Sequence, residues 1–114
     1  MEKFSQKQCL PCEVGQPAIK GQRIDEFLAQ LDGWSCVDNH HLVKSYKFKD
    51  FKQALSFVND VGHLAEEEGH HPDIFLSWGR VELKIWTHKI DGLSENDFIL
   101  ADKCDAAHVG RFGS

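Results

Sequence analysis

The chain has 114 residues, a hydrophobic fraction of 41% and a formal net charge of −5. This length fits one domain with a modest core, and the negative charge argues against direct nucleic-acid binding by bulk electrostatics. The sequence has no apolar run long enough to span a membrane and no N-terminal segment of the signal-peptide type. We therefore expect a cytoplasmic protein with no membrane partner.

The N-terminal region contains the only closely spaced cysteine pair, Cys9 and Cys12. A structural zinc site needs two more ligands at matched spacing. A thioredoxin-like site needs a strand before the pair and a helix after it, whereas Gly15 and Pro17 interrupt the residues that follow. We interpret residues 1–20 as an irregular N-terminal tail with a reduced cysteine pair, and a weak metal or redox role is the alternative.

The first predicted helix begins at Gly21 and ends at Gly33. It is predicted from apolar residues at positions i, i+3, i+4 and i+7, which share one face of a helix. These residues are Ile24, Phe27, Leu28 and Leu31. Two strands are then predicted over residues 34–38 and 41–48, with a turn at Asn39 and His40.

A second helix is predicted between Asp50, a suitable N-cap, and Gly69, a natural stop. Its apolar stripe is formed by Phe51, Ala54, Leu55, Val58, Val61 and Ala65, with Phe57 and Leu64 beside it. This stripe predicts one helix face packed on a core.

The second predicted hairpin joins residues 74–78 and 81–87 through a type II′ turn at Gly79 and Arg80. This turn pairs Trp78 with Val81, Leu76 with Leu83 and Ile74 with Ile85, which gives one apolar face. Extended outward, the same register places His71 opposite His88, with Cβ atoms about 5 Å apart. Because histidine titrates near neutral pH, histidines that converge here can supply both an acid and a base.

A third helix is predicted from Ser94, where Ser94 and Asp97 form a capping box with Asp in place of the usual Glu or Gln. The tail from about Ala106 is expected to fray. The order α-β-β-α-β-β-α predicts an α+β two-layer sandwich, with an antiparallel four-stranded sheet and helices on one face. The predicted domain spans residues 21–105, between the tails 1–20 and 106–114.

Four motifs are spaced along this predicted domain: Glu66-x-x-x-His70-His71-Pro72, an aromatic Trp78, Thr87-His88, and Gly92-Leu93-Ser94-Glu95-x-Asp97. Together they resemble the pterin-4a-carbinolamine dehydratase family, over about residues 20–105. The resemblance implies a hydro-lyase that removes water from 4a-hydroxytetrahydrobiopterin. The product, quinonoid dihydropterin, feeds the recycling of the pterin used by aromatic amino-acid hydroxylases.

The resemblance also implies roles for individual residues. His70, His71 and His88 would be the catalytic imidazoles. The pterin-binding residues would be Gly69, His70, His71, Trp86, Thr87, His88 and Lys89. Glu66 and Asp97 would be supporting carboxylates near the site.

The chemistry of the elimination suits histidine. A proton must reach the departing 4a-hydroxyl, and another must leave the neighbouring ring nitrogen, and groups with a pKa near the working pH do both best. The nitrogen lone pair itself expels the hydroxyl, so we expect no metal and no cofactor, the pterin being the substrate. Our hypothesis is that His70 or His71 acts as the acid and His88 as the base, and the sequence leaves the division open.

Two alternatives use the same residues or the same fold differently. In the first, His70, His71 and His88 join Asp97 or Glu66 in a metal site, since imidazole and carboxylate bind zinc. In the second, the chain is a dimerisation or regulatory module. The resemblance implies such a role with a transcription factor in some members, and a functional link to phenylalanine hydroxylase in bacterial relatives. We expect a homodimer or homotetramer that associates through the second predicted helix.

Overall fold

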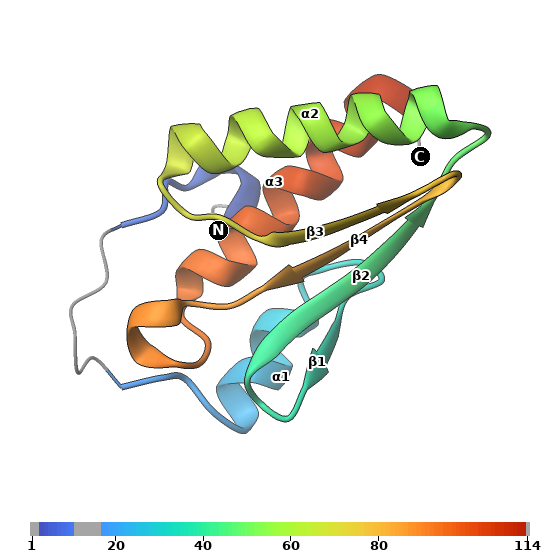
Figure 1. The fold of residues 1–114 in the computed structure, drawn as a ribbon. Helices are drawn as coiled ribbons and strands as arrows, with labels where there is room; N and C mark the ends of the chain where they lie inside the picture. The colour runs from blue at the N-terminus through green and yellow to red at the C-terminus, as the bar shows by residue number, and fades with distance from the viewer. Residues whose placement is uncertain (1–2, 11–16, 114) are drawn as a thin grey trace.

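The computed structural model describes residues 3–10 and 17–113. The elements in chain order are η1 (Phe4–Gln6), α1 (Gln22–Leu28), β1 (Ser35–Val37), β2 (His41–Lys47), α2 (Phe51–Glu68), β3 (Asp73–Ser77), β4 (Arg80–Ile85), η2 (His88–Ile90) and α3 (Glu95–Phe112) (Figure 1). The predicted α+β class and the order of helices and strands are confirmed. Within the described residues, no helix is both long and apolar enough to cross a membrane.

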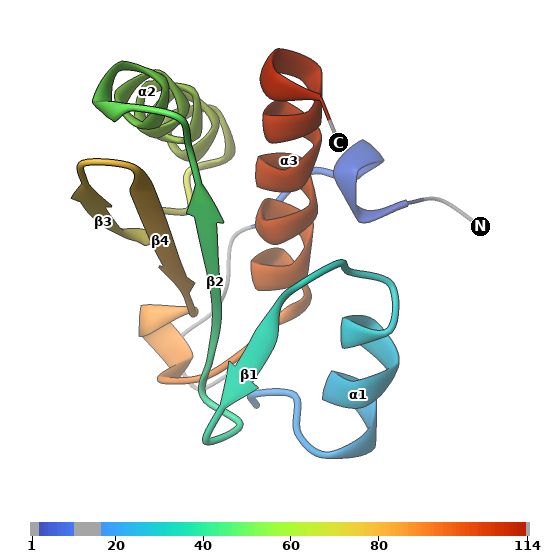
Figure 2. The ribbon, with the colours of Figure 1, turned by 90° about the vertical axis from the view of Figure 1, so that its right-hand side faces the viewer.

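The four strands form one antiparallel sheet in the order β1-β2-β4-β3, so β1 and β3 are its edges. Figure 2 shows α1 and α3 on the same side of this sheet, and α2 packs against both α3 and the β3–β4 hairpin. The core between the layers is apolar, and its fully buried residues include Phe57, Leu83, Ile85 and Phe98.

The register of the β3–β4 hairpin differs from the prediction by two residues. Ile74 pairs with Leu83 and Ser77 pairs with Arg80, so Trp78 and Gly79 form the turn. Trp78 is therefore 68% exposed at the tip of the hairpin, where the sequence had predicted a strand residue. Neither turn residue has a left-handed φ, so the turn is not of the predicted type II′.

The physical reason for this register is a contact with the end of β2. The backbone N–H of Phe48 donates to the carbonyl oxygen of Gly79 at 2.8 Å. A Cβ at Gly79 would lie 3.0 Å from the Phe48 oxygen, so the close approach favours glycine there. Strand pairing now begins at Asp73, and the prediction that His71 lies directly opposite His88 in the ladder is wrong.

Helix α2 has both predicted ends. The Asp50 carboxylate accepts from the Gln53 N–H at 2.9 Å, and Gly69 ends the helix with a left-handed φ of 64°. The buried face differs from the predicted stripe, because it runs through Ala54, Phe57, Val61 and Ala65. Phe51 and Leu55 are 44% and 41% exposed, since α2 turns its Phe57 side toward α3 and the sheet.

Helix α3 continues to Phe112, so the prediction of a frayed tail from Ala106 is wrong. The ring of Phe112 lies 5.1 Å from that of Phe48 and 5.4 Å from that of His108. His108 also contacts Tyr46, with ring centroids 5.1 Å apart, and burial lowers its pKa. Aromatic packing of this kind holds the last turns of a helix that contains Gly110 and is followed by Gly113.

Part of the N-terminal region packs against the domain. Phe4 is 3% exposed, and its ring lies 5.3 Å from that of Phe27 and 6.0 Å from that of Phe98. Residues 3–10 therefore contribute to the core, which no periodic pattern in the sequence had indicated. Cys9 belongs to this segment, whereas Cys12 lies outside the described residues.

Candidate active site

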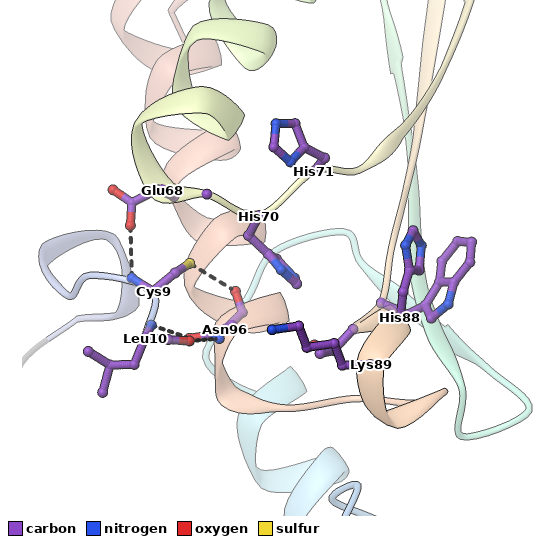
Figure 3. A pocket seen from close by; sticks show the side chains of 11 residues that line it. Cys9, Leu10, Glu68, His70, His71, His88, Lys89 and Asn96 are labelled. Carbon is purple, nitrogen blue, oxygen red and sulfur yellow. Dashed lines mark hydrogen bonds between the residues drawn. The ribbon is translucent and has the colours of Figure 1, made fainter. Parts of the chain in front are cut away.

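A cavity of about 400 Å³ opens between the end of α2, the end of β4 and the start of α3. Figure 3 shows that its labelled side chains come from these three regions and from the N-terminal segment. The residues that line it are Cys9, Leu10, Glu68, Gly69, His70, His71, Trp86, Thr87, His88, Lys89 and Asn96. All seven residues that the family resemblance placed around the pterin are among them.

The ends of the secondary structure elements position the histidines. Gly69 adopts the left-handed conformation that turns the chain out of α2, and His70 and His71 follow at once. The His70 N–H still donates to the Ala65 carbonyl at 3.2 Å, which fixes the start of this exit. On the other side, Thr87 pairs with Gly92 and encloses the short helix η2, which begins with His88.

His70 is held by a buried carboxylate. Its Nε2 lies 2.6 Å from Oδ1 of Asp97, a residue with no exposed surface. The other oxygen of Asp97 accepts from the Thr87 hydroxyl at 2.9 Å and from the Ser94 N–H at 2.8 Å. The second of these bonds belongs to the predicted capping box of α3, so one side chain both starts the helix and orients the histidine.

This network sets the tautomer of His70. The Asp97 carboxylate is an acceptor, so Nε2 of His70 carries a hydrogen and donates it. Nδ1 is then the ring nitrogen that exchanges a proton with a ligand. A carboxylate in this position also stabilises the imidazolium form when the ring is protonated. His70 is thus suited to hold a proton and release it at one defined atom.

His71 is arranged differently. Its Nε2 lies 2.5 Å from Oε2 of Glu66, and both side chains are largely exposed. Figure 3 shows its ring turned away from His88. Glu66, predicted as a supporting carboxylate, is therefore the partner of His71 and does not line the cavity.

His88 stands on the opposite side of the cavity beside Trp86, with ring centroids 4.3 Å apart in an edge-on arrangement. The Trp86 ring also packs against His40 and His41, with ring centroids 5.5 Å and 6.2 Å apart. His40 in turn contacts Asp91 at 2.7 Å. Burial, followed by the charges of Lys84 and His40, lowers the pKa of His41.

Several of these residues had no predicted role. His40 was predicted in a turn and His41 at the start of a strand. The β2–β4 register, with Leu42 opposite Ile85, brings His41 beside Trp86. Cys9, Leu10, Glu68 and Asn96 line the cavity as well. Position in the motifs could have indicated Glu68 and Asn96, which neighbour Gly69 and Asp97, but no sequence signal points to Cys9 and Leu10.

The donor arrangement does not favour the metal alternative. Among residues 3–10 and 17–113, no three His, Cys, Asp or Glu side chains are grouped so that they could hold a metal ion. Two of the predicted ligands, His70 and His71, pair with separate carboxylates. His70 contacts buried Asp97, and His71 contacts exposed Glu66.

Comparison with known proteins identifies the family. The family model for pterin 4 alpha carbinolamine dehydratase matches residues 17–107. A protein of Rubrobacter xylanophilus is 51% identical over 92% of this chain and 98% of its own, and one of Alkaliphilus metalliredigens is 49% identical over 92% and 96%. Each carries the name "Putative pterin-4-alpha-carbinolamine dehydratase".

A solved structure supports the same assignment. The transcriptional coactivator/pterin dehydratase from Brucella melitensis superposes with a TM-score of 0.74 at 36% identity, over 78% of this chain and 96% of the other. The sequence relatives and the solved structure agree with the family model, and this chain belongs to the pterin 4 alpha carbinolamine dehydratase family.

Proposed function

We propose that this protein is a hydro-lyase that eliminates water from 4a-hydroxytetrahydrobiopterin and releases quinonoid dihydropterin. The observation that carries the proposal is the pairing of His70 with buried Asp97 at 2.6 Å, in the same cavity as His88. Family membership supplies the substrate class. The recycled pterin would serve an aromatic amino-acid hydroxylase, with phenylalanine hydroxylase as the expected functional partner.

In the proposed mechanism, His70 is the general acid. Its Nδ1–H protonates the 4a-hydroxyl while the C4a–O bond breaks, and water leaves. His88 accepts the proton from the adjacent ring nitrogen, whose electron pair forms the new C=N bond. We assign the acid to His70 rather than His71 because His71 pairs with Glu66 at the surface. Solvent then returns the two histidines to their starting protonation states.

Replacement of His88 by alanine tests the proposed base. We expect the rate of dehydration of freshly prepared 4a-hydroxytetrahydrobiopterin, followed optically, to fall by about 10²–10⁴-fold, the usual contribution of a general acid or base. The matched control is His63→Ala, because His63 is an exposed residue of α2 outside the cavity. Near wild-type turnover in His88→Ala would remove His88 from the mechanism.

The alternative function is that of an interaction module. It is favoured by the solved relative described as a transcriptional coactivator/pterin dehydratase, which is 36% identical to this chain. The two functions are separable, because a variant without His88 keeps the surfaces of α2 and β3. Retention of the cellular role by a catalytically inactive variant would support the binding function.

We also propose that the protein self-associates as a homodimer or homotetramer. Large apolar side chains are exposed along α2, the edge strand β3 and the turn after it: Phe51, Leu55, Ile74, Phe75 and Trp78. An edge strand beside exposed apolar surface is a usual site of self-association. Leu55→Lys should shift the mass measured by light scattering toward the monomer, with Val109→Lys on α3 as the control. An unchanged mass would place the interface elsewhere.

A further inference from the structure

Residues 3–10 form an N-terminal strap that is fastened along α3. Phe4 anchors it in the core, and the Ser5 N–H donates to Asp102 at 2.8 Å. The Ser5 carbonyl accepts from Lys103 at 3.0 Å, and Lys7 pairs with Glu95 at 2.7 Å. Because these contacts follow α3 toward its first turn, they lead the strap to the cavity.

The far end of the strap is held by two residues of the cavity wall. The Cys9 N–H donates to Oε1 of Glu68 at 2.8 Å. Asn96 makes a two-way amide pairing with Leu10: its Oδ1 accepts from the Leu10 N–H at 2.9 Å and its Nδ2 donates to the Leu10 carbonyl at 2.5 Å. Figure 3 shows these bonds and the Cys9 sulfur on the cavity side, while the Leu10 side chain points away from His70.

The two anchoring residues are neighbours of the His70–Asp97 pair in the sequence. Glu68 lies two residues before His70, at the end of α2, and Asn96 lies one residue before Asp97, at the start of α3. The strap therefore connects the two helix ends that bring this pair together. It also lies outside residues 17–107, to which the family model matches.

We propose that Cys9 and the backbone of Leu10 form a wall of the pterin-binding pocket, and that Asn96 and Glu68 are positioning residues that hold this wall. The inference rests on the proposed function, because it assigns the strap to the pocket of that reaction. Burial, and then the charge of Glu68, raises the pKa of the Cys9 thiol to about 12, so the wall presents a neutral thiol to the bound ring.

Loss of a bond in this wall should weaken pterin binding more than it slows the chemical step. The proton-transferring atoms belong to His70 and His88, which the strap does not replace. A wall displaced from the cavity loses contacts that the bound pterin makes in the ground state and transition state alike, and this raises KM with little change in kcat. A change confined to overall stability would leave KM of the folded enzyme unaltered.

The test is a double-mutant cycle on the full chain with Asn96→Ala and Leu10→Pro. Proline at position 10 removes the N–H that Asn96 accepts. We expect each single variant to raise KM, and the dissociation constant of 7,8-dihydrobiopterin measured by calorimetry, about 10-fold, the usual effect of removing one partner of a shielded hydrogen bond. If Asn96 acts through the strap, adding Asn96→Ala to the Leu10→Pro variant should raise KM and the dissociation constant at most twofold further.

The matched control is Gln8→Pro. Gln8 is exposed on the same strap, the structure gives its N–H no bond within the described residues, and the preceding Lys7 is already extended with φ −93° and ψ 164°. This variant should bind the pterin as the wild type does. Fully additive effects in the cycle, or unchanged binding in Leu10→Pro, would overturn the proposal.

Glu68 gives a second, independent measurement. Glu68→Gln keeps a carbonyl acceptor for the Cys9 N–H and should retain pterin affinity. Glu68→Ala lacks this acceptor, and its pterin affinity should fall about 10-fold. Equal losses in the two variants would contradict the positioning role. Calorimetric binding also separates the two proposals: a wild type that binds the pterin through a coupled strap but shows no turnover would refute the dehydratase function and leave the strap assignment standing.

Discussion

Asp97→Asn is expected to lower kcat/KM for dehydration by about 10²–10⁴-fold, with little change in size or shape at the site. The carboxylate of Asp97 accepts the hydrogen on Nε2 of His70 at 2.6 Å. An asparagine amide that keeps its oxygen on Thr87 and the Ser94 N–H presents its NH₂ group to His70 instead. The imidazole then accepts at Nε2 and carries its only hydrogen on Nδ1. Giving that hydrogen to the hydroxyl would leave an imidazolate, whereas the wild-type ring, which also carries the Nε2 hydrogen bonded to Asp97, is left as a neutral imidazole.

The measurement compares initial rates with the free energy of unfolding of the same preparations. Asn at position 97 retains an acceptor for the N-cap of α3, so the variant should remain folded at assay temperature. Asp60→Asn is the control, because Asp60 pairs with Arg111 on the surface at 2.5 Å, far from the cavity residues. Wild-type turnover in Asp97→Asn would show that the pair is structural and would move the acid to another group.

Local signals predicted the parts of the fold that local interactions determine. The helix starts at Asp50 and Ser94 and the stop at Gly69 depend on bonds within one turn of the chain, and the structure has all three. The hairpin register failed because it depends on a contact between Phe48 and Gly79, which are distant in sequence. The helical pattern of residues 106–112 lacked strong periodicity, and its packing partners include Tyr46 of β2 and Phe57 of α2.

The residues of the site divide in the same way, into those found from local sequence signals and those that depend on contacts between distant residues. His70, His71 and His88 were found from motifs, and His88 and Lys89 were placed directly after the predicted strand 81–87, although β4 already ends at Ile85. The inward turn of His70 and the outward turn of His71 could not be predicted, because each depends on which carboxylate lies nearby. The contribution of Cys9 and Leu10 depends on an irregular segment docking on α3, and an irregular segment has no periodicity from which docking can be predicted.

Asp105→Ala is expected to produce a large loss of folding stability. The Asp105 carboxylate accepts from the Trp34 indole at 3.0 Å, from Lys44 at 2.8 Å and from the Tyr46 hydroxyl. The side chains of Asp105 and Lys44 are only 16% and 17% exposed. Burial, and then the Asp105 charge, raises the pKa of Tyr46, so its hydroxyl stays a donor.

Removing the carboxylate deprives three shielded donors of this acceptor: the Lys44 ammonium, the Trp34 indole N–H and the Tyr46 hydroxyl. Breaking one side of a buried ion pair costs about 3–5 kcal/mol, because the remaining charge is uncompensated. Urea unfolding should show this loss in the free energy of unfolding at constant m-value. The control is Asp60→Ala, which breaks the more exposed pair with Arg111 and should cost at most about 1 kcal/mol.

The same variant separates stability from catalysis. Asp105 does not line the catalytic cavity, so turnover per folded molecule should remain near that of the wild type below the unfolding transition. A loss smaller than about 1 kcal/mol would mean that Lys44 finds other acceptors, and the carbonyl of Asp32, already 2.7 Å from its Nζ, is the nearest candidate. A loss of turnover in folded Asp105→Ala would instead show that the position of α3 on the sheet controls its N-terminal end, where Asp97 holds His70.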